Sequence, residues 1–216
     1  MKLLFLSILI MIGICSCDLL EPKKEDPNTL NGDVNLDYTK VGYKSNVYIK
    51  IDNGSVPNGT MTVQKNENGI VTYKININMA GFKDSAFYAN LLGPDNRDNK
   101  GNVFVELKMK VTSEGIQDFY NREKPWTVLK YNDGVGTEYP YVKANGEKLI
   151  RKITEKTGKD DWPYGMLYIK TSKVESDMPS DDKYAKKIIF RANHKFGLVY
   201  VELILINGQS VKMNIM

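Results

Sequence analysis

The residues best suited to chemistry in this chain lie in one short run, residues 159–165 (KDDWPYG). Two adjacent carboxylates, Asp160 and Asp161, precede two aromatic side chains, Trp162 and Tyr164, that flank a proline. Ionised carboxylates accept hydrogen bonds from sugar hydroxyls, and aromatic rings can stack on the apolar faces of sugars. Trp and Tyr are also favoured where proteins bind one another. The run predicts a platform that binds a glycan or another macromolecule.

Two further aromatic–proline sites extend this candidate platform. Tyr139 and Tyr141 flank a proline, and Trp126 directly follows one. The alternative interpretation is structural. In that case Trp126 and Trp162 fill the two ends of the core, and the proline–aromatic pairs shape turns. The sequence leaves both interpretations open.

Few features of the sequence point to catalysis. Two carboxylates can hydrolyse a glycosidic bond when they are held about 5–10 Å apart, which keeps a carboxylate-dependent hydrolase as an alternative. His194 is the only histidine, and no G-x-S-x-G motif accompanies it. Glycine motifs that bind nucleotides are also missing. We expect a non-enzymatic binding protein without a cofactor.

A metal site is not expected either. Asp33, Asn35 and Asp37 occupy positions 1, 3 and 5 of a run that resembles the start of an EF-hand calcium loop. Position 6 is Tyr38 instead of glycine, and position 12 is Lys44 instead of glutamate. The run is better explained as part of a polar segment.

Cysteine usage and charge exclude further classes. Both cysteines, Cys15 and Cys17, lie in the N-terminal apolar segment, so the rest of the chain has no disulfide, cysteine nucleophile or cysteine-ligated zinc. The formal net charge is +4, and lysines are interspersed with acidic residues. Nucleic-acid binding needs clustered basic residues, so we expect no nucleic-acid partner.

The candidate site residues must be held in place by the secondary structure of the chain. Apolar side chains alternate with polar ones with a period of two residues along most of the chain, which predicts β-strands. Clean apolar rows occur in residues 71–79 and 103–111, and Asn-Gly pairs at 68–69 and 207–208 predict tight hairpins. Residues 197–206 are apolar on both faces, which favours a central strand. The other expected strands cover residues 47–51, 61–63, 87–91, 127–131, 147–157, 165–174, 187–192 and 210–216.

The expected fold is all-β, an antiparallel sandwich or barrel of about ten or eleven strands. Residues 113–121 predict one or two helical turns, with a serine as the N-cap. Residues 147–157 fit a short helix or a strand, and we favour the strand. A boundary near residues 132–138 would divide the domain into two similar modules.

The N-terminal segment indicates the cellular location of the domain. Lys2 precedes an apolar run at residues 3–14, which spans about 18 Å as a helix and is too short for a hydrocarbon core of about 30 Å. It is typical of a signal peptide. Residues 14–17 (ICSC) then resemble the lipobox of bacterial lipoproteins. The resemblance implies cleavage before Cys17 and attachment of a diacylglyceryl group to its sulfur.

Three regions follow from this resemblance. Residues 1–16 are the predicted signal peptide, residues 17–36 a lipidated and flexible tether, and residues 37–216 the β domain. The expected partner is a membrane, contacted through the lipid at the bacterial cell envelope. The outer membrane or cell surface is favoured, while Asp18 keeps the periplasmic face of the inner membrane open.

The expected function is that of a lipid-anchored module that binds a macromolecule or glycan. One alternative is a structural subunit that docks another envelope protein through a strand edge or aromatic loops. The second alternative is the carboxylate-dependent hydrolase. A third is a barrel that holds an apolar ligand, which requires an internal cavity in place of a filled core.

Overall fold

The computed structural model describes residues 26–51, 58–79, 98, 102–119 and 124–216. These residues form fourteen strands and one short 3-10 helix, η1 (Asp37–Thr39). The strands are β1 (Lys44–Ile51), β2 (Asn58–Glu67), β3 (Ile70–Ile77), β4 (Val103–Val111), β5 (Gly115–Asp118), β6 (Trp126–Lys130), β7 (Glu138–Val142), β8 (Lys148–Lys156), β9 (Trp162–Tyr164), β10 (Leu167–Ile169), β11 (Ser172–Asp177), β12 (Ala185–Asn193), β13 (Gly197–Leu205) and β14 (Ser210–Ile215).

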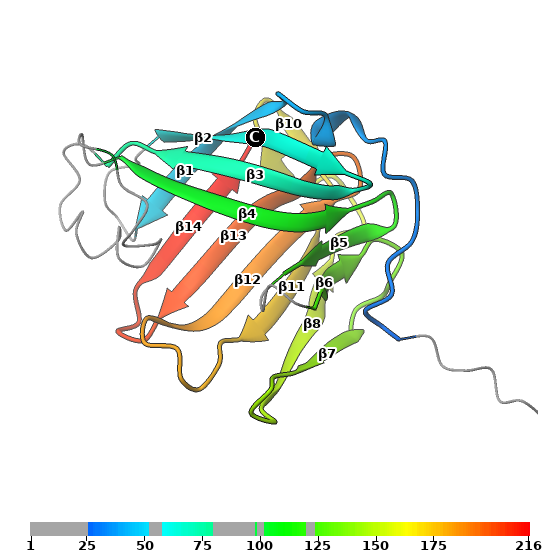
Figure 1. Ribbon diagram of the computed structural model, residues 1–216, viewed down its shortest axis with the longest axis vertical. Helices are drawn as coiled ribbons and strands as arrows, with labels where there is room; N and C mark the ends of the chain where they lie inside the picture. Colours follow the sequence, from blue (N-terminus) through cyan, green and yellow to red (C-terminus); the bar gives the residue numbers. More distant parts are fainter. Residues whose placement is uncertain (1–25, 52–57, 80–97, 99–101, 120–123) are drawn as a thin grey trace, which may run out of the picture.

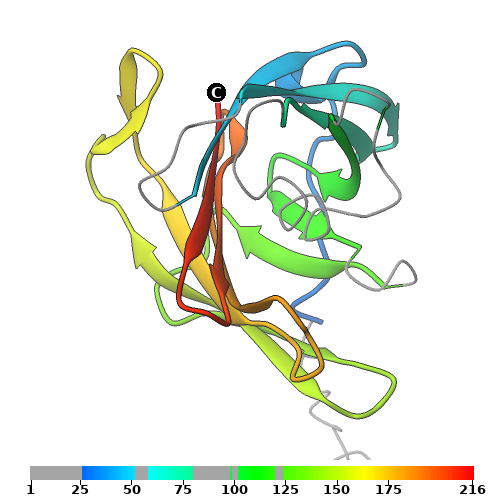
Figure 2. The same ribbon diagram turned by 90° about the vertical axis from the view of Figure 1, so that its left-hand side faces the viewer.

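Twelve of these strands form one antiparallel sheet that curls into a nearly closed barrel (Figure 1). The first six strands follow the order β6-β5-β4-β3-β2-β1, and the sheet continues as β14-β13-β12-β11-β8-β7. The two runs join where β1 pairs with β14, with Val47 opposite Ile215. The remaining pair, β9 and β10, forms a hairpin that projects from the sheet (Figure 2). The all-β prediction is confirmed, and the barrel-like form is the one observed.

The predicted boundary near residues 132–138 falls between β6 and β7. It therefore separates the two six-stranded runs along the chain. It does not create two independent modules, because the pairing of β1 with β14 joins both runs into one sheet.

Side chains close the barrel where its edge strands β6 and β7 meet. The indole nitrogen of Trp126 donates to the carbonyl oxygen of Tyr139 at 2.9 Å, and the backbone nitrogen of Lys130 donates to the Tyr139 hydroxyl at 3.0 Å. Trp126 also stacks on Tyr141, with ring centroids 5.3 Å apart. Burial and the hydrogen bond to Asp133 raise the pKa of the Tyr139 hydroxyl, so it stays a neutral donor.

Alternating apolar side chains explain the buried interior. Every second residue of β1 and of β3 is buried, as the period of a half-buried strand requires. Asn68 and Gly69 both have positive φ, 51° and 83°, which is the backbone of a tight hairpin turn. The predicted hairpins β2–β3 and β13–β14 are both confirmed.

Several local predictions are wrong. Residues 113–121 contain strand β5 instead of helical turns, because this segment pairs with both β4 and β6. Residues 165–174 are divided between β10 and β11. The expected strand at 147–157 is confirmed as β8. The strand expected at 87–91 lies outside the described residues.

Residues 26–36, expected within the flexible tether, lie against the barrel instead. Leu30 is buried, and the side-chain amide of Asn28 donates to the carbonyl oxygen of Pro140 at 2.9 Å. The low apolar content suggested a free segment, but one buried leucine and hydrogen bonds to the barrel hold this stretch in place. The predicted signal peptide and Cys17 lie outside the described residues.

Candidate functional site

Three of the aromatic residues predicted for the binding platform are buried. Trp126, Tyr139 and Tyr141 expose only 2%, 1% and 6% of their surfaces and pack in the closure between β6 and β7. That part of the prediction is wrong, because the prolines beside these rings lie at or within edge strands whose aromatic side chains face the core. The structural interpretation of Trp126 is the one that fits.

The other predicted aromatic pair lies on the β9–β10 hairpin, separate from that closure. Trp162 meets the ring of Tyr200 edge-on at 5.2 Å, and Tyr164 packs on Phe196 at 4.5 Å, both measured between ring centroids. The guanidinium carbon of Arg191 lies 4.3 Å from the centre of the Trp162 ring. These contacts attach the hairpin to β12 and β13.

The two predicted carboxylates lie in an exposed stretch before β9. Asp160 and Asp161 are both exposed, and neither lines the groove or the cavity described below. Their exposed position outside these two hollows does not support the carboxylate-dependent hydrolase. The seven predicted residues do not come together as one site.

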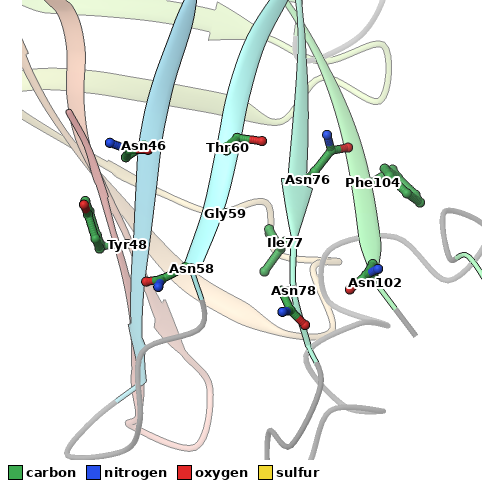
Figure 3. Close-up of a pocket in the computed structure, with 10 residues that line it drawn as sticks. All are labelled: Asn46, Tyr48, Asn58, Gly59, Thr60, Asn76, Ile77, Asn78, Asn102 and Phe104. Carbon is green, nitrogen blue, oxygen red and sulfur yellow. The ribbon is translucent and has the colours of Figure 1, made fainter. Parts of the chain in front are cut away.

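A different surface is hollowed into a groove with a volume of about 450 Å³ (Figure 3). This volume is within the range of small-molecule sites, roughly 300–1,000 Å³. The groove crosses β1 to β4, and none of the described residues that line it is charged. It is lined by Asn46, Tyr48, Asn58, Gly59, Thr60, Asn76, Ile77, Asn78, Asn102 and Phe104.

The register of the strands brings these residues together in two rows. Cross-strand partners form the first row, which consists of Asn46, Thr60, Asn76 and Phe104. The second row begins with Tyr48 opposite Asn58, and the backbone nitrogen of Asn78 donates to the carbonyl of Asn58 at 3.1 Å. Because alternate residues of a strand share a face, both rows lie on the outer face while Val47 and Ile75 point into the barrel.

Three exposed polar side chains of the groove, those of Asn46, Asn58 and Thr60, are available to a ligand. Within the described part of the chain, the side chains of Asn46, Asn58 and Thr60 form no hydrogen bond, and the Oδ1 atom of Asn76 is buried without a partner. Asn102 is held differently, because its side-chain nitrogen donates to Asp98 at 2.9 Å. An unsatisfied buried acceptor costs about 1–3 kcal/mol, so Asn76 is not optimised for stability alone.

Aromatic rings border the asparagines on two sides, as Figure 3 shows. Tyr48 on β1 is 38% exposed, and Phe104 on β4 is half-buried. The ammonium group of Lys74 lies 4.9 Å from the centre of the Phe104 ring. Amides both donate and accept hydrogen bonds, and rings offer apolar faces, so the groove suits a neutral ligand that carries many hydroxyl groups.

The sequence did not point to this groove. In residues 71–79 each asparagine of the polar row could be explained as a solvated side chain. The available signal was the repetition of asparagine on adjacent strands, as at Asn58 and Asn76, but its meaning depends on strand register. Register is fixed by pairing across the sheet and not by one strand alone.

Other kinds of site find no support in the described ranges. They contain no group of three or more His, Cys, Asp or Glu side chains that could hold a metal ion. In the same ranges, no helix has the length and apolar character needed to cross a membrane. No protein-family model matches the chain, and no match is found among curated proteins or solved structures.

Proposed function

We propose that this protein is a lipid-anchored lipoprotein of the bacterial envelope that binds a neutral glycan in the groove across β1 to β4, without catalysing a reaction. The observation that carries the proposal is the uncharged lining, with five asparagines between the rings of Tyr48 and Phe104. Sugar hydroxyls, like amides, both donate and accept hydrogen bonds. Anionic ligands such as phosphates favour charged donors, and the described residues of this lining include none.

The free amides favour binding because a ligand would not have to break protein hydrogen bonds. Asn46 and Asn58 are exposed and form no side-chain hydrogen bond within the described residues. The sheet holds their backbones in place, since Asn46 exchanges two backbone hydrogen bonds with Met216, at 2.7 and 2.9 Å. A rigid backbone with free side chains reduces the ordering cost of binding.

The envelope location rests on the resemblance of residues 14–17 to a lipobox. Two or more acyl chains hold a protein at a bilayer far more firmly than one, so a lipidated Cys17 would present the barrel at a membrane surface. The outer membrane or cell surface remains the favoured location, because a protein there can contact glycans outside the cell.

An array of immobilised neutral glycans tests the groove. The protein is the mature chain, residues 17–216, with Cys17→Ser so that it stays free of lipid and detergent. We expect saturable binding to a subset of glycans, weakened about tenfold by Tyr48→Ala through loss of ring stacking. Asn58→Ala should weaken it about fivefold, the effect of one hydrogen bond worth ~1 kcal/mol.

The matched control is Tyr168→Ala. Tyr168 is also an exposed tyrosine, 65% accessible, but it lies on β10 outside the groove. Its replacement should leave the glycan affinity unchanged. Equal losses from Tyr48→Ala and Tyr168→Ala, or no glycan bound at all, would contradict the proposed site.

Metabolic labelling tests the anchor. Cells grown with a palmitate analogue should label the wild-type protein and leave the Cys17→Ser variant unlabelled. Unchanged labelling of the variant would remove the proposed anchor. This result is independent of the glycan array, so the two parts of the proposal can fail separately.

The exposed tip of the β9–β10 hairpin favours a second candidate function, docking of another envelope protein. Met166 is fully exposed, and its neighbours Leu167 and Tyr168 are 58% and 65% exposed. The tip of the hairpin projects from the barrel in Figure 2. A photo-crosslinking residue at position 167 should capture one defined partner in cells, whereas the same residue at Val135, an exposed loop position, should not.

A further inference from the structure

The interior of the barrel is not completely filled. A cavity of about 220 Å³ lies among residues of β3, β4, β5, β12, β13 and β14, and its lining is almost wholly apolar. The side chains that open onto it and are only half-buried include Val105, Leu107, Ile188, Val201, Leu203 and Met213. These residues lie on the inner face, opposite to the groove.

The hollow lies at the middle of the strands. On β4, Val105 and Leu107 are half-buried, whereas Val103 near the start of the strand is completely buried. On β13, Leu203 is half-buried and Leu205 at the strand end exposes 1%. Two separate clusters of buried side chains fill the interior on either side. The core is therefore packed at its ends and open between them.

Two charged residues, Lys108 on β4 and Asp118 on β5, border this apolar space. Asp118 on β5 lines the cavity and accepts a hydrogen bond from the Nη2 atom of Arg151 at 2.6 Å. Its other oxygen, Oδ1, is buried without a partner. Arg151 exposes only 2% of its side chain and lies 3.7 Å from the centre of the Trp126 ring. Because Arg151 balances the carboxylate charge, the free oxygen suits a neutral donor.

We propose that this cavity binds a small apolar molecule that carries one hydroxyl group. Its hydrocarbon part lies among Leu107, Leu203 and Met213, and its hydroxyl donates to Oδ1 of Asp118. Apolar cavities of about 150 Å³ already admit benzene, so this larger hollow admits a larger ring system. The site is distinct from the groove, because it lies mainly on the other face of the sheet and favours apolar ligands, while Ile77 lines both.

Titration with 1-naphthol, followed by its fluorescence, tests the cavity in the mature chain with Cys17→Ser. We expect saturable binding of one molecule per chain. Naphthalene, which has the same rings and no hydroxyl, should bind about tenfold more weakly, because a hydrogen bond to a charged acceptor is worth roughly 1.5–3 kcal/mol. Equal affinity for the two probes would overturn the role of Asp118.

Two variants fill the cavity, Leu203→Phe and Val105→Phe. Each should weaken 1-naphthol binding at least tenfold while the melting temperature stays equal or rises, because the new ring occupies empty space. Val142→Phe is the matched control, since Val142 is 61% exposed on β7. It should leave the affinity unchanged.

Binding that survives both filling variants, or no saturable binding by the wild type, would overturn the proposal. If neither variant folds, nuclear Overhauser contacts between 1-naphthol and the methyl group of Met213 in the wild type decide the question. Their presence supports the cavity, and their absence while the probe is bound contradicts it.

Discussion

The outer and inner faces of β3 and β4 carry opposite chemistry one residue apart. Asn76 lies in an uncharged polar groove, while its neighbour Ile75 lines an apolar cavity. On β4 the same step separates Phe104 from Val105. Because a strand directs alternate side chains to opposite faces, a single pair of strands contributes to two sites without conflict. Apart from Ile77, which lines both hollows, the side chains of each site can be altered while the other site is kept.

The largest expected effect is on the inner face. Arg151→Met removes the ion-pair partner of Asp118 and leaves a partly buried carboxylate, 22% exposed, unpaired, which should lower the free energy of unfolding by about 3 kcal/mol. Urea denaturation measures it. Lys152→Ala is the control, because Lys152 forms an ion pair with Glu138 in which both side chains are about half exposed, and such pairs contribute only ~0–1 kcal/mol. A loss below about 1 kcal/mol for Arg151→Met would contradict the buried ion pair.

The next effect is on the outer face alone. Phe104→Ala removes one ring that borders the groove, and we expect about tenfold weaker glycan binding. Binding of 1-naphthol inside the barrel should change by less than about twofold, because Phe104 points away from the cavity. Titration of both ligands against the one variant measures both effects. A parallel loss of both affinities would show that the two faces are not independent.

Asn76→Leu should separate binding from stability. In the wild type, the Oδ1 atom of Asn76 is buried without a hydrogen-bond partner. An apolar side chain of similar size should therefore keep the free energy of unfolding or raise it by up to about 1 kcal/mol. Glycan binding should fall about fivefold, because one amide of the groove is lost. A clear drop in stability would mean that the amide supports the fold instead of the site.

The smallest expected effect comes from an ion cluster away from both sites. Hydrogen bonds from Lys173 and Lys187 lower the pKa of Glu175 to about 2. A carboxyl group with a depressed pKa stabilises the fold above its ordinary value near 4.5, and this contribution disappears as the pH falls towards 2.

Glu175→Gln removes this contribution at neutral pH. We expect the melting temperature to fall by roughly 2 °C at pH 7 and the difference from wild type to vanish near pH 2. Calorimetric scans at several pH values measure the trend. A difference that stays constant from pH 7 to pH 2 would show that the ion cluster does not stabilise the protein through its charge.

Much of the fold could be predicted from local patterns. The apolar row of residues 71–79 and the Asn68-Gly69 pair define β3 and its turn, because alternation and turn backbone are properties of neighbouring residues. The segment around Gln117 shows that local patterns do not always predict the secondary structure. This segment reads as a short helix, yet it forms β5 because β4 and β6 provide pairing on both sides.

The binding surfaces were harder to predict for the same reason. Strict alternation places Val199 beside Val201 on one face and Leu198 on the other. In the structure, Leu198 and Val201 both line the cavity, because the pairing of β12 with β13 is shifted near Ala192. A β-bulge of this kind changes which side chains share a face, and the sequence carries no clear signal for it.

The most direct test of the proposed function is a nuclear magnetic resonance titration of the asparagine side-chain amides with a neutral glycan selected on the array. We expect shifts for the amides of Asn46, Asn58 and Asn76, with saturation at one common affinity, and no shift of the Trp162 indole on the β9–β10 hairpin. Shifts confined to the Trp162 indole, with the three amides unmoved, would contradict the assignment of the binding site to the groove.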